Sequence, residues 1–92
     1  MKKYKINRYE YELLKDYKDG FLLDEVIGKD TEYFDPYDYI VGDWSYGKLR
    51  LKGFCDKENK LYRKANDIET VEQYIKNYCS YECRYFILKK CK

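Results

Sequence analysis

Two short runs of alternating residues, joined by a turn that contains glycine, constrain the fold of this chain more than any other feature. Apolar and polar residues alternate over 38–43 and again over 48–54, and Trp44–Gly47 separates the two runs. A period of two is typical of strands, because successive side chains point to opposite faces of a sheet. A short loop with glycine between two such runs indicates antiparallel neighbours. The sequence therefore predicts an antiparallel β-hairpin over about 38–54.

The length of the loop predicts which residues of this hairpin face each other. A four-residue loop would span Trp44–Gly47 and leave the two runs directly opposite. The predicted pairs are Asp43 with Lys48, Val41 with Arg50, and Tyr39 with Lys52. The other face is expected to point into the core and carries Ile40, Gly42, Leu49 and Leu51.

Two stretches with helical spacing flank the hairpin. The first covers about 21–28, where Asp19 is expected to cap the first turn and Gly28 to end the helix. The second covers about 67–79, and Asn66 and Glu69 stand at the spacing of a capping box. Its apolar residues recur at helical intervals and predict a stripe that faces the core: Ile68, Val71, Tyr74, Ile75 and Tyr78.

Strands are expected near both ends of the chain. Residues 3–17 alternate loosely, which favours one or two strands, and residues 30–37 are expected to form a loop or a short turn. The run Tyr85–Leu88 is continuously apolar, so a strand over about 84–90 is expected to lie centrally with both faces buried. The order of strand, helix, hairpin, helix and strand predicts an α+β fold in a single domain, 1–92.

Charge is segregated along the chain, although the net charge is only +2. Between Asp19 and Asp43, eight acidic residues accompany a single base, Lys29. Between Lys48 and Lys64, seven basic residues accompany two acidic ones. Such segregation marks a face for nucleic acid or for a charged protein, and it also arises when two solvated faces of one small domain attract each other.

The composition excludes more chemistry than it suggests. The chain has no histidine, which removes the commonest general base and most catalytic metal sites. Its five glycines are isolated and form no phosphate-binding loop. Asp43 has a position defined by the hairpin but no second convergent group beside it in the sequence. We therefore expect no enzymatic activity, no cofactor and no metal site.

Four cysteines raise the alternatives of a zinc site, a disulfide and reduced thiols. Cys91 lies beyond a predicted strand that places it about 26 Å from Cys83, which argues against one zinc ion shared by all four. A disulfide between Cys79 and Cys83 is compatible with their spacing. Cytosolic thiols stay reduced and nothing signals secretion, so the prediction is four reduced thiols, with a redox role for Cys79 and Cys83 left open.

The composition also indicates the state of the chain and the cellular compartment in which we expect it. A fifth of its residues are aromatic, which excludes intrinsic disorder. No apolar run approaches the roughly 20 residues of a membrane-spanning helix, and no apolar stretch follows the basic start at Met1–Lys5. We expect a cytoplasmic protein that has no membrane partner.

Basic and aromatic residues come together at the predicted hairpin. The candidate contact residues are Trp44, Tyr46, Lys48, Arg50 and Lys52. Basic residues at every second position can follow a phosphate backbone, and an aromatic ring can stack on a base. The first hypothesis is thus a non-enzymatic binding module that contacts RNA or DNA through 44–52. The alternative is a protein-interaction adaptor that uses the acidic 19–43 segment, and an ordinary hairpin with Trp44 in the core also fits.

The hairpin region resembles the YutD-like proteins of low-GC Gram-positive bacteria. The residues that carry the resemblance run from Tyr37 to Phe54 and include the sequence Tyr-Asp-Tyr-Ile-Val-Gly-Asp-Trp over 37–44. The stretch Tyr74–Lys90, with its paired cysteines, also resembles that family, and 7–21 resembles it more loosely. The resemblance implies a small cytosolic α+β domain without an assigned activity, so no catalytic or ligand-binding residues are transferred. It further implies that the hairpin and 79–88 define the fold.

Overall fold

A five-stranded antiparallel sheet forms the centre of the computed structural model, which describes residues 2–78 and 83–91. The strands and helices are β1 (Lys2–Ile6), β2 (Tyr9–Tyr17), α1 (Leu23–Lys29), β3 (Tyr39–Ser45), β4 (Lys48–Phe54), α2 (Val71–Tyr78) and β5 (Tyr85–Lys90). Single 3₁₀ turns occur at Glu32–Phe34, Lys64–Asn66 and Ile68–Thr70. The α+β class expected from the sequence is confirmed.

The last strand of the chain joins the two halves of the sheet. The spatial order is β1-β2-β5-β3-β4, so β5 lies between β2 and β3 and pairs antiparallel with both. Its central position is as predicted, but the burial of both faces is not. Phe86 and Leu88 are buried, whereas Tyr85 and Ile87 on the other face are only half-buried. The described part of α2 packs on this face through a small apolar cluster that includes Ile87 and leaves both residues partly exposed.

The hairpin forms where it was expected, with a different register. Ser45 pairs with Lys48 across a two-residue turn, so Asp43 faces Arg50 and Val41 faces Lys52. The turn residues Tyr46 and Gly47 both have positive φ, 53° and 75°. Positive φ at both positions defines a type I′ turn, whose twist matches that of the strands and favours the shorter loop. The predicted pairs are therefore wrong by two residues. A slip of two leaves every side chain on its predicted face.

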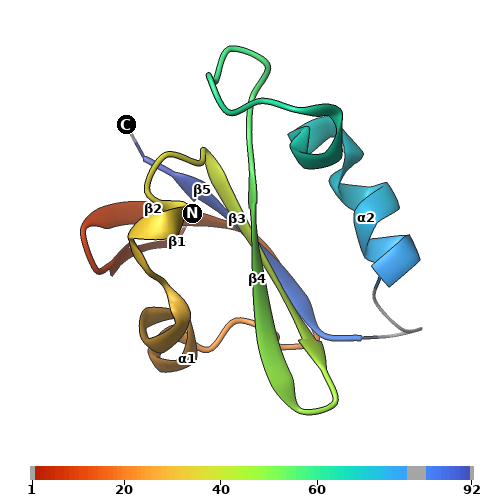
Figure 1. Cartoon of the computed structure of the whole chain (residues 1–92). Helices are drawn as coiled ribbons and strands as arrows, with labels where there is room; N and C mark the ends of the chain where they lie inside the picture. The colour runs from red at the N-terminus through yellow and green to blue at the C-terminus, as the bar shows by residue number, and fades with distance from the viewer. Residues whose placement is uncertain (1, 79–82, 92) are drawn as a thin grey trace.

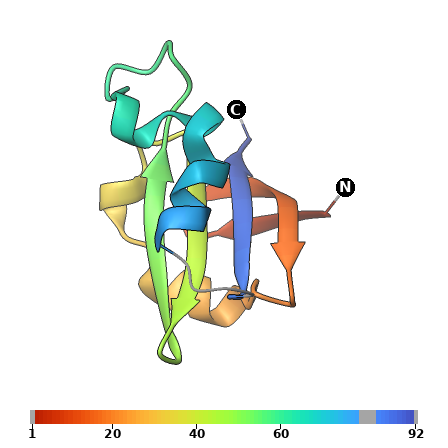
Figure 2. The ribbon, with the colours of Figure 1, turned by 90° about the vertical axis from the view of Figure 1, so that its right-hand side faces the viewer.

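The two helices cover opposite faces of the sheet, as Figure 1 shows. Figure 2 shows α2 lying in front of β3, β4 and β5. Beneath α1, the core contains Ile6, Tyr11, Val26, Phe34, Ile40, Leu49, Phe86 and Leu88. Beneath α2, the core contains Tyr39, Val41 and Phe54, packed against Ile68, Val71, Tyr74, Ile75 and Ile87. The predicted apolar stripe of the second helix is thus confirmed for its four members whose side chains are described.

The helix expected over about 21–28 is present as α1, but Asp19 and Gly28 are not the residues that begin and end it. Asp19 does not cap it, because α1 begins later, and its N-cap Leu22 makes no side-chain hydrogen bond. Asp16 instead holds the approach to the helix, accepting a hydrogen bond from the Phe21 N–H at 3.0 Å. Gly28 lies inside α1, which continues to Lys29.

The capping of the second helical region falls one residue later than expected. Asp67, not Asn66, accepts a hydrogen bond from the Glu69 N–H, at 2.9 Å. The Asn66 side chain turns back to accept from the Arg63 N–H at 2.7 Å. A 3₁₀ turn at Ile68–Thr70 therefore precedes α2, which is described to Tyr78. Across the described residues, no helix is both long and apolar enough to cross a membrane.

Candidate functional site

The five candidate contact residues of the hairpin do not share one face of the sheet. Lys48, Arg50 and Lys52 alternate along β4 and point to the face that α2 covers. Trp44 belongs to the opposite face and packs against the core beneath α1. Tyr46 lies in the turn at the tip of the hairpin. A continuous surface made of the basic row and the indole ring is therefore not formed.

Arg50 is neutralised by the residue opposite it in β3. Its Nε lies 3.0 Å from Asp43 Oδ1 and its Nη2 lies 2.8 Å from Asp43 Oδ2, a bidentate ion pair. The hydrogen bonding of the Arg50 guanidinium to the Asp43 carboxylate is the main cause that raises the pKa of Arg50. Asp43 is only 2% exposed and the Arg50 side chain 46% exposed. The pair interrupts the basic row in the middle of β4.

Lys52 is also engaged within the chain. Its Nζ donates a hydrogen bond to the Ala65 carbonyl oxygen at 3.0 Å. The same nitrogen lies 4.6 Å from the centre of the Tyr74 ring and 5.1 Å from that of Phe54, both within the range of a cation–π contact. Lys52 therefore ties β4 to the loop before α2, whereas Lys48, next to the turn, is exposed.

Trp44 connects the hairpin to two other parts of the chain. Its Nε1 donates a hydrogen bond to the Gly20 carbonyl oxygen at 2.7 Å. The Arg84 guanidinium lies 4.7 Å from its ring centre, and Arg84 Nη2 also donates to the Asp19 carbonyl oxygen at 3.0 Å. One face of the indole ring thus already carries a cation. Trp44 therefore serves the packing of the fold, as expected for an ordinary hairpin with Trp44 in the core.

Tyr46 is the candidate residue that the fold leaves fully exposed. Its φ of 53° places a bulky side chain in the left-handed region, where Asn and Gly are the preferred residues of a type I′ turn. A tyrosine at this position costs conformational energy and gains no burial in return. The structure therefore gives Tyr46 no stabilising role within the chain.

Much of the acidic 19–43 segment is used inside the fold. Asp30, Asp38 and Asp43 are buried. Asp35 forms a bidentate pair with Arg8, at 2.9 and 3.0 Å, and this hydrogen bonding lowers the pKa of Asp35. The acidic residues of the segment that remain exposed are Asp19, Asp24, Glu25 and Glu32. Two of them lie in the first turn of α1, which also leaves Leu22 and Ile27 partly exposed.

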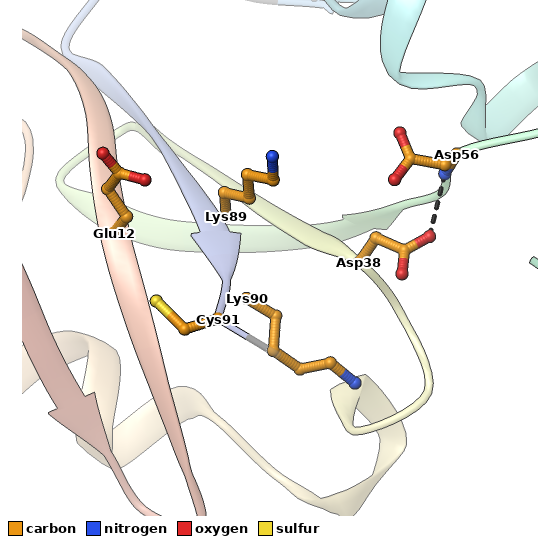
Figure 3. A pocket seen from close by; sticks show the side chains of 6 residues that line it. All are labelled: Glu12, Asp38, Asp56, Lys89, Lys90 and Cys91. Carbon is orange, nitrogen blue, oxygen red and sulfur yellow. Dashed lines mark hydrogen bonds between the residues drawn. The ribbon is translucent and has the colours of Figure 1, made fainter.

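A hollow of about 270 Å³ lies at the end of β5, lined by Glu12, Asp38, Asp56, Lys89, Lys90 and Cys91 (Figure 3). The Asp38 carboxylate accepts hydrogen bonds from the Asp56 N–H at 2.9 Å and from Asn59 Nδ2 at 3.1 Å. Lys90 turns away and donates to the Asp35 carbonyl oxygen at 2.5 Å. The two hydrogen bonds to Asp38 hold the turn that follows β4, so the buried Asp38 carboxylate stabilises the fold.

The cysteines differ from the prediction of four reduced thiols. Cys83 is disulfide-bonded, whereas Cys55 and Cys91 are free. The prediction rested on the reducing cytosol, but a cysteine also pairs when a second sulfur comes within reach in the fold. Burial is the main cause that raises the pKa of the Cys55 thiol. Cys79 lies outside the described residues, so the prediction for it stays a prediction. Among the residues that the structure describes, no group of three or more side chains is placed to hold a metal ion.

A second hollow, of about 200 Å³, borders β4 and was not predicted from the sequence. Its lining includes Tyr33, Tyr37, Leu51, Gly53 and Arg63. A Cβ atom at Gly53 would overlap the Tyr37 ring, so this glycine permits the ring to lie against the strand. An isolated glycine within a strand pattern signals such a close approach. In the sequence, the isolated Gly53 is therefore the feature that could have indicated this hollow.

Sequence comparison identifies the relatives of this chain. A family model described as "Putative antitoxin YutD-like" matches residues 5–89. The chain belongs to the YutD-like family. It is 42% identical over 87 residues to "Putative antitoxin YutD" of Bacillus subtilis (strain 168), an alignment that covers 95% of this chain and 96% of the relative.

A solved structure supports the same family assignment. The solution NMR structure of protein yutD from B. subtilis superposes with a TM-score of 0.82 at 40% identity. The superposition covers all of this chain and 84% of the other. The resemblance of the hairpin to YutD-like proteins is therefore confirmed, and the YutD-like fold is the one described above.

Proposed function

We propose that this YutD-like chain is a cytoplasmic, non-enzymatic protein-binding module that acts as an antitoxin, through contact with a partner protein. The Bacillus subtilis relative bears the name of a putative antitoxin. An antitoxin counteracts a toxin, and a folded protein does so most directly by binding it. The proposal keeps the protein partner of the alternative hypothesis, but it places the contact at the hairpin tip instead of on the acidic 19–43 segment.

Tyr46 is the observation that carries this proposal. It is fully exposed at the tip of the hairpin and has a positive φ that disfavours a bulky residue. Tyrosine is one of the residues most enriched at the energetic centres of protein interfaces, because it adds a large contact area at a small entropic cost. A residue that costs stability and projects into solvent is what an interface anchor requires.

The charged residues favour a protein over a nucleic acid as the partner. Asp43 neutralises Arg50, and Lys52 is held by the Ala65 carbonyl oxygen and two aromatic rings. Arg84 occupies a face of the Trp44 ring that a base would stack on. Contact with nucleic acid through 44–52 would then depend mainly on Tyr46 and Lys48, which is less than a phosphate-tracking row requires.

The carboxylates support a role without catalysis. Asp38 accepts two hydrogen bonds that hold a turn, and Asp43 is committed to its bidentate pair with Arg50. Asp43 also lines neither of the hollows beside β5 and β4. The larger of these, at about 270 Å³, falls below the roughly 300–1,000 Å³ that is typical of small-molecule sites.

The test compares capture of partners by the unaltered chain and by Tyr46→Asn. Asparagine before Gly47 is the preferred sequence of a type I′ turn, so we expect the variant to gain on the order of 0.5 kcal/mol of stability. A tagged chain expressed in Bacillus subtilis should retain a protein after nuclease treatment, and Tyr46→Asn should lose it. Urea unfolding of both proteins separates lost contact from lost folding.

Two further results would decide against the proposal. If nuclease removes every captured partner, the nucleic-acid hypothesis replaces it. If Tyr46→Asn retains the protein and the double variant Asp24→Lys, Glu25→Lys loses it, the contact lies on the exposed acidic turn of α1 instead of on the hairpin tip.

A further inference from the structure

We propose that the hollow beside β4 binds an extended segment of the partner protein that contains proline and a carboxylate side chain. The inference rests on the proposed protein-binding function and adds a second contact surface, together with the chemistry of the segment recognised. The hollow measures about 200 Å³, and the lining residues that would recognise the segment are Tyr33, Tyr37 and Arg63.

Two tyrosine rings form the aromatic wall of the hollow. The ring centres of Tyr33 and Tyr37 lie 5.6 Å apart, and the ring planes are inclined by 41°. Tyr37 packs on Gly53, where a Cβ atom would overlap its ring, and the half-buried Leu51 extends the apolar lining. Tyr33 remains 66% exposed, so its ring is open to a ligand. Grooves lined by aromatic rings are common docking sites for proline-rich segments.

The loop that carries these rings is held in place by contacts within the chain. The Tyr33 N–H donates to Thr31 Oγ1 at 3.3 Å. The buried Phe34 ring packs against Tyr33 in a T-shaped arrangement, with 5.1 Å between the ring centres. Asn59 Nδ2 donates to the Pro36 carbonyl oxygen at 2.8 Å and ties this loop to the turn after β4. Such a preorganised surface loses little conformational entropy when it binds a ligand.

The polar groups that the hollow leaves available are hydrogen-bond donors. The Tyr37 hydroxyl donates to the Tyr33 hydroxyl at 3.3 Å, so the proton of the Tyr33 hydroxyl is left for an acceptor outside the chain. Arg63 is exposed, and its guanidinium forms no ion pair and no hydrogen bond with any residue that the structure describes.

The other polar side chains of the lining are already used within the fold. Lys52 donates to the Ala65 carbonyl oxygen. The Asn66 amide accepts from the Arg63 N–H and donates to the Leu61 carbonyl oxygen. The hollow therefore favours a ligand that supplies acceptors and brings few donors of its own.

An acidic segment that contains proline has this chemistry. Proline has no N–H, and a polyproline II helix makes no internal hydrogen bonds, so its carbonyl oxygens are free to accept. Its proline rings would lie on the rings of Tyr33 and Tyr37, with a backbone carbonyl oxygen at the Tyr33 hydroxyl. A carboxylate of the segment would pair with the Arg63 guanidinium in a charge-assisted contact.

A second copy of the chain does not supply such a segment. Pro36 is the only proline of the sequence. The carboxylate that precedes it, on Asp35, is already paired with Arg8 at 2.9 and 3.0 Å. The Pro36 carbonyl oxygen is likewise occupied, by Asn59. The occupant therefore belongs to a different protein.

Nucleic acid also offers acceptors and rings, but the charges at the hollow disfavour it. Affinity for a phosphate backbone grows with the number of phosphates that cations neutralise. Within the described lining, Arg63 is the one cation without a partner, and the exposed Glu32 precedes Tyr33 in the chain. A single guanidinium suits a single carboxylate better than a row of phosphates.

The experiment titrates the ¹⁵N-labelled chain with a short synthetic peptide of repeated Pro-Pro-Glu units. We expect saturable amide shift changes at Tyr33, Tyr37, Leu51 and Arg63. Tyr33→Ala and Arg63→Glu should each weaken binding by about tenfold or more. Both side chains are exposed, and the spectrum of each variant without peptide shows whether it remains folded.

Matched controls separate the two parts of the recognition. Lys64→Glu removes the same charge from the neighbouring exposed residue, which does not line the hollow, and should leave the affinity unchanged. A Pro-Pro-Lys peptide keeps the proline rings but not the carboxylates, and a Gly-Gly-Glu peptide keeps the carboxylates but not the rings. Neither control peptide should bind the hollow.

Several outcomes would overturn the proposal. These are the absence of saturable shift changes at the hollow, equal binding of either control peptide, and an equal loss of affinity in Lys64→Glu. Stronger binding of a short oligonucleotide at the same residues would assign the hollow to nucleic acid. Shift changes there that depend on the concentration of the chain, without peptide, would assign it to a second copy.

Capture of partners in Bacillus subtilis separates this inference from the proposed function. If Tyr46→Asn abolishes capture of the partner protein while Arg63→Glu leaves it intact, the chain binds a protein without using the hollow, and only the inference fails. If nuclease removes every captured partner, the function fails independently of the titration, because the peptide measurement contains no cellular component.

Discussion

Arg50 and Asp43 contribute unequally to the hairpin, because water reaches one partner and not the other. The carboxylate of Asp43 is almost completely buried, whereas about half of the Arg50 side chain is exposed. A buried charge that loses its partner keeps its desolvation penalty, but an exposed charge regains water. The individual environment of each residue therefore decides the cost of breaking the pair.

We predict that Arg50→Gln destabilises the fold more than Asp43→Asn does. The first change leaves a buried carboxylate without its cation, and a cost of about 1–3 kcal/mol follows. The second change leaves a guanidinium that can turn to solvent. Urea unfolding of the two single variants and of the double variant measures the difference. Equal losses for the two single variants would contradict this account of their environments.

At the scale of elements, close approaches decide which glycines the fold requires. In β3, a Cβ atom at Gly42 would overlap the Phe86 ring of the neighbouring strand β5. In α1, a Cβ atom at Gly28 would meet nothing within 4 Å. The same residue type thus permits tight packing between strands at one site and merely adds backbone freedom to a helix at the other.

We predict opposite effects for alanine at these two positions. Gly42→Ala should destabilise the fold by about 1–3 kcal/mol, because Phe86 must move within a packed core. Gly28→Ala should stabilise it by about 0.5–1 kcal/mol, because alanine is the better helix former. Thermal unfolding of both variants provides the measurement, with each serving as the control for the other. Loss of stability in Gly28→Ala would show that this position is not open.

At the scale of the whole molecule, the burial of tyrosines makes stability depend on pH. Tyr39 is buried beneath α2 and donates a hydrogen bond to Asp56 Oδ1 at 3.2 Å. Burial, and next the charge of Asp56, raise the pKa of Tyr39 to about 12. Burial likewise raises the pKa of Tyr11, on the other side of the sheet. The folded chain therefore retains the hydroxyl protons of Tyr39 and Tyr11 near pH 10, where the unfolded chain releases them.

We predict that the free energy of unfolding falls as the pH rises from about 10 to about 12. A pKa that is raised in the folded state contributes stability below the unfolded pKa, and this contribution is lost as the pH approaches the folded value. Tyr39→Phe should reduce the loss over this window by on the order of 1 kcal/mol. The reduction is partial because Tyr11 remains. Urea unfolding at several alkaline pH values measures it, and an unchanged slope would refute the assignment to Tyr39.

The sequence predicts those parts of this fold that depend on residues close together in the chain. The period of two over 38–54 and the helical stripe from Ile68 to Ile75 both produced the elements that the structure contains. These patterns arise from local backbone geometry, which each segment carries by itself. The hairpin register was missed because Tyr46 gives no sign that it adopts a positive φ.

The candidate site was predictable only in part, for a related reason. The sequence identified the exposed Tyr46 and Lys48, but it could not show that Asp43 lies opposite Arg50 or that Arg84 stacks on Trp44. The isolated Gly53 signals a close approach at β4, but the sequence could not show that residues near 33, 51 and 63 come together there.

The sequence by itself determined the classes of element, their faces and the family, since alternation, helical spacing and the YutD-like motif are all local. Only the tertiary structure decided that β5 inserts between β2 and β3 and that β4 is the last strand of the sheet. It also decided which charges of the hairpin are neutralised and which stay available. The physical reason is that pairing, burial and ion-pair partners depend on residues distant in the chain, whose approach no local pattern encodes.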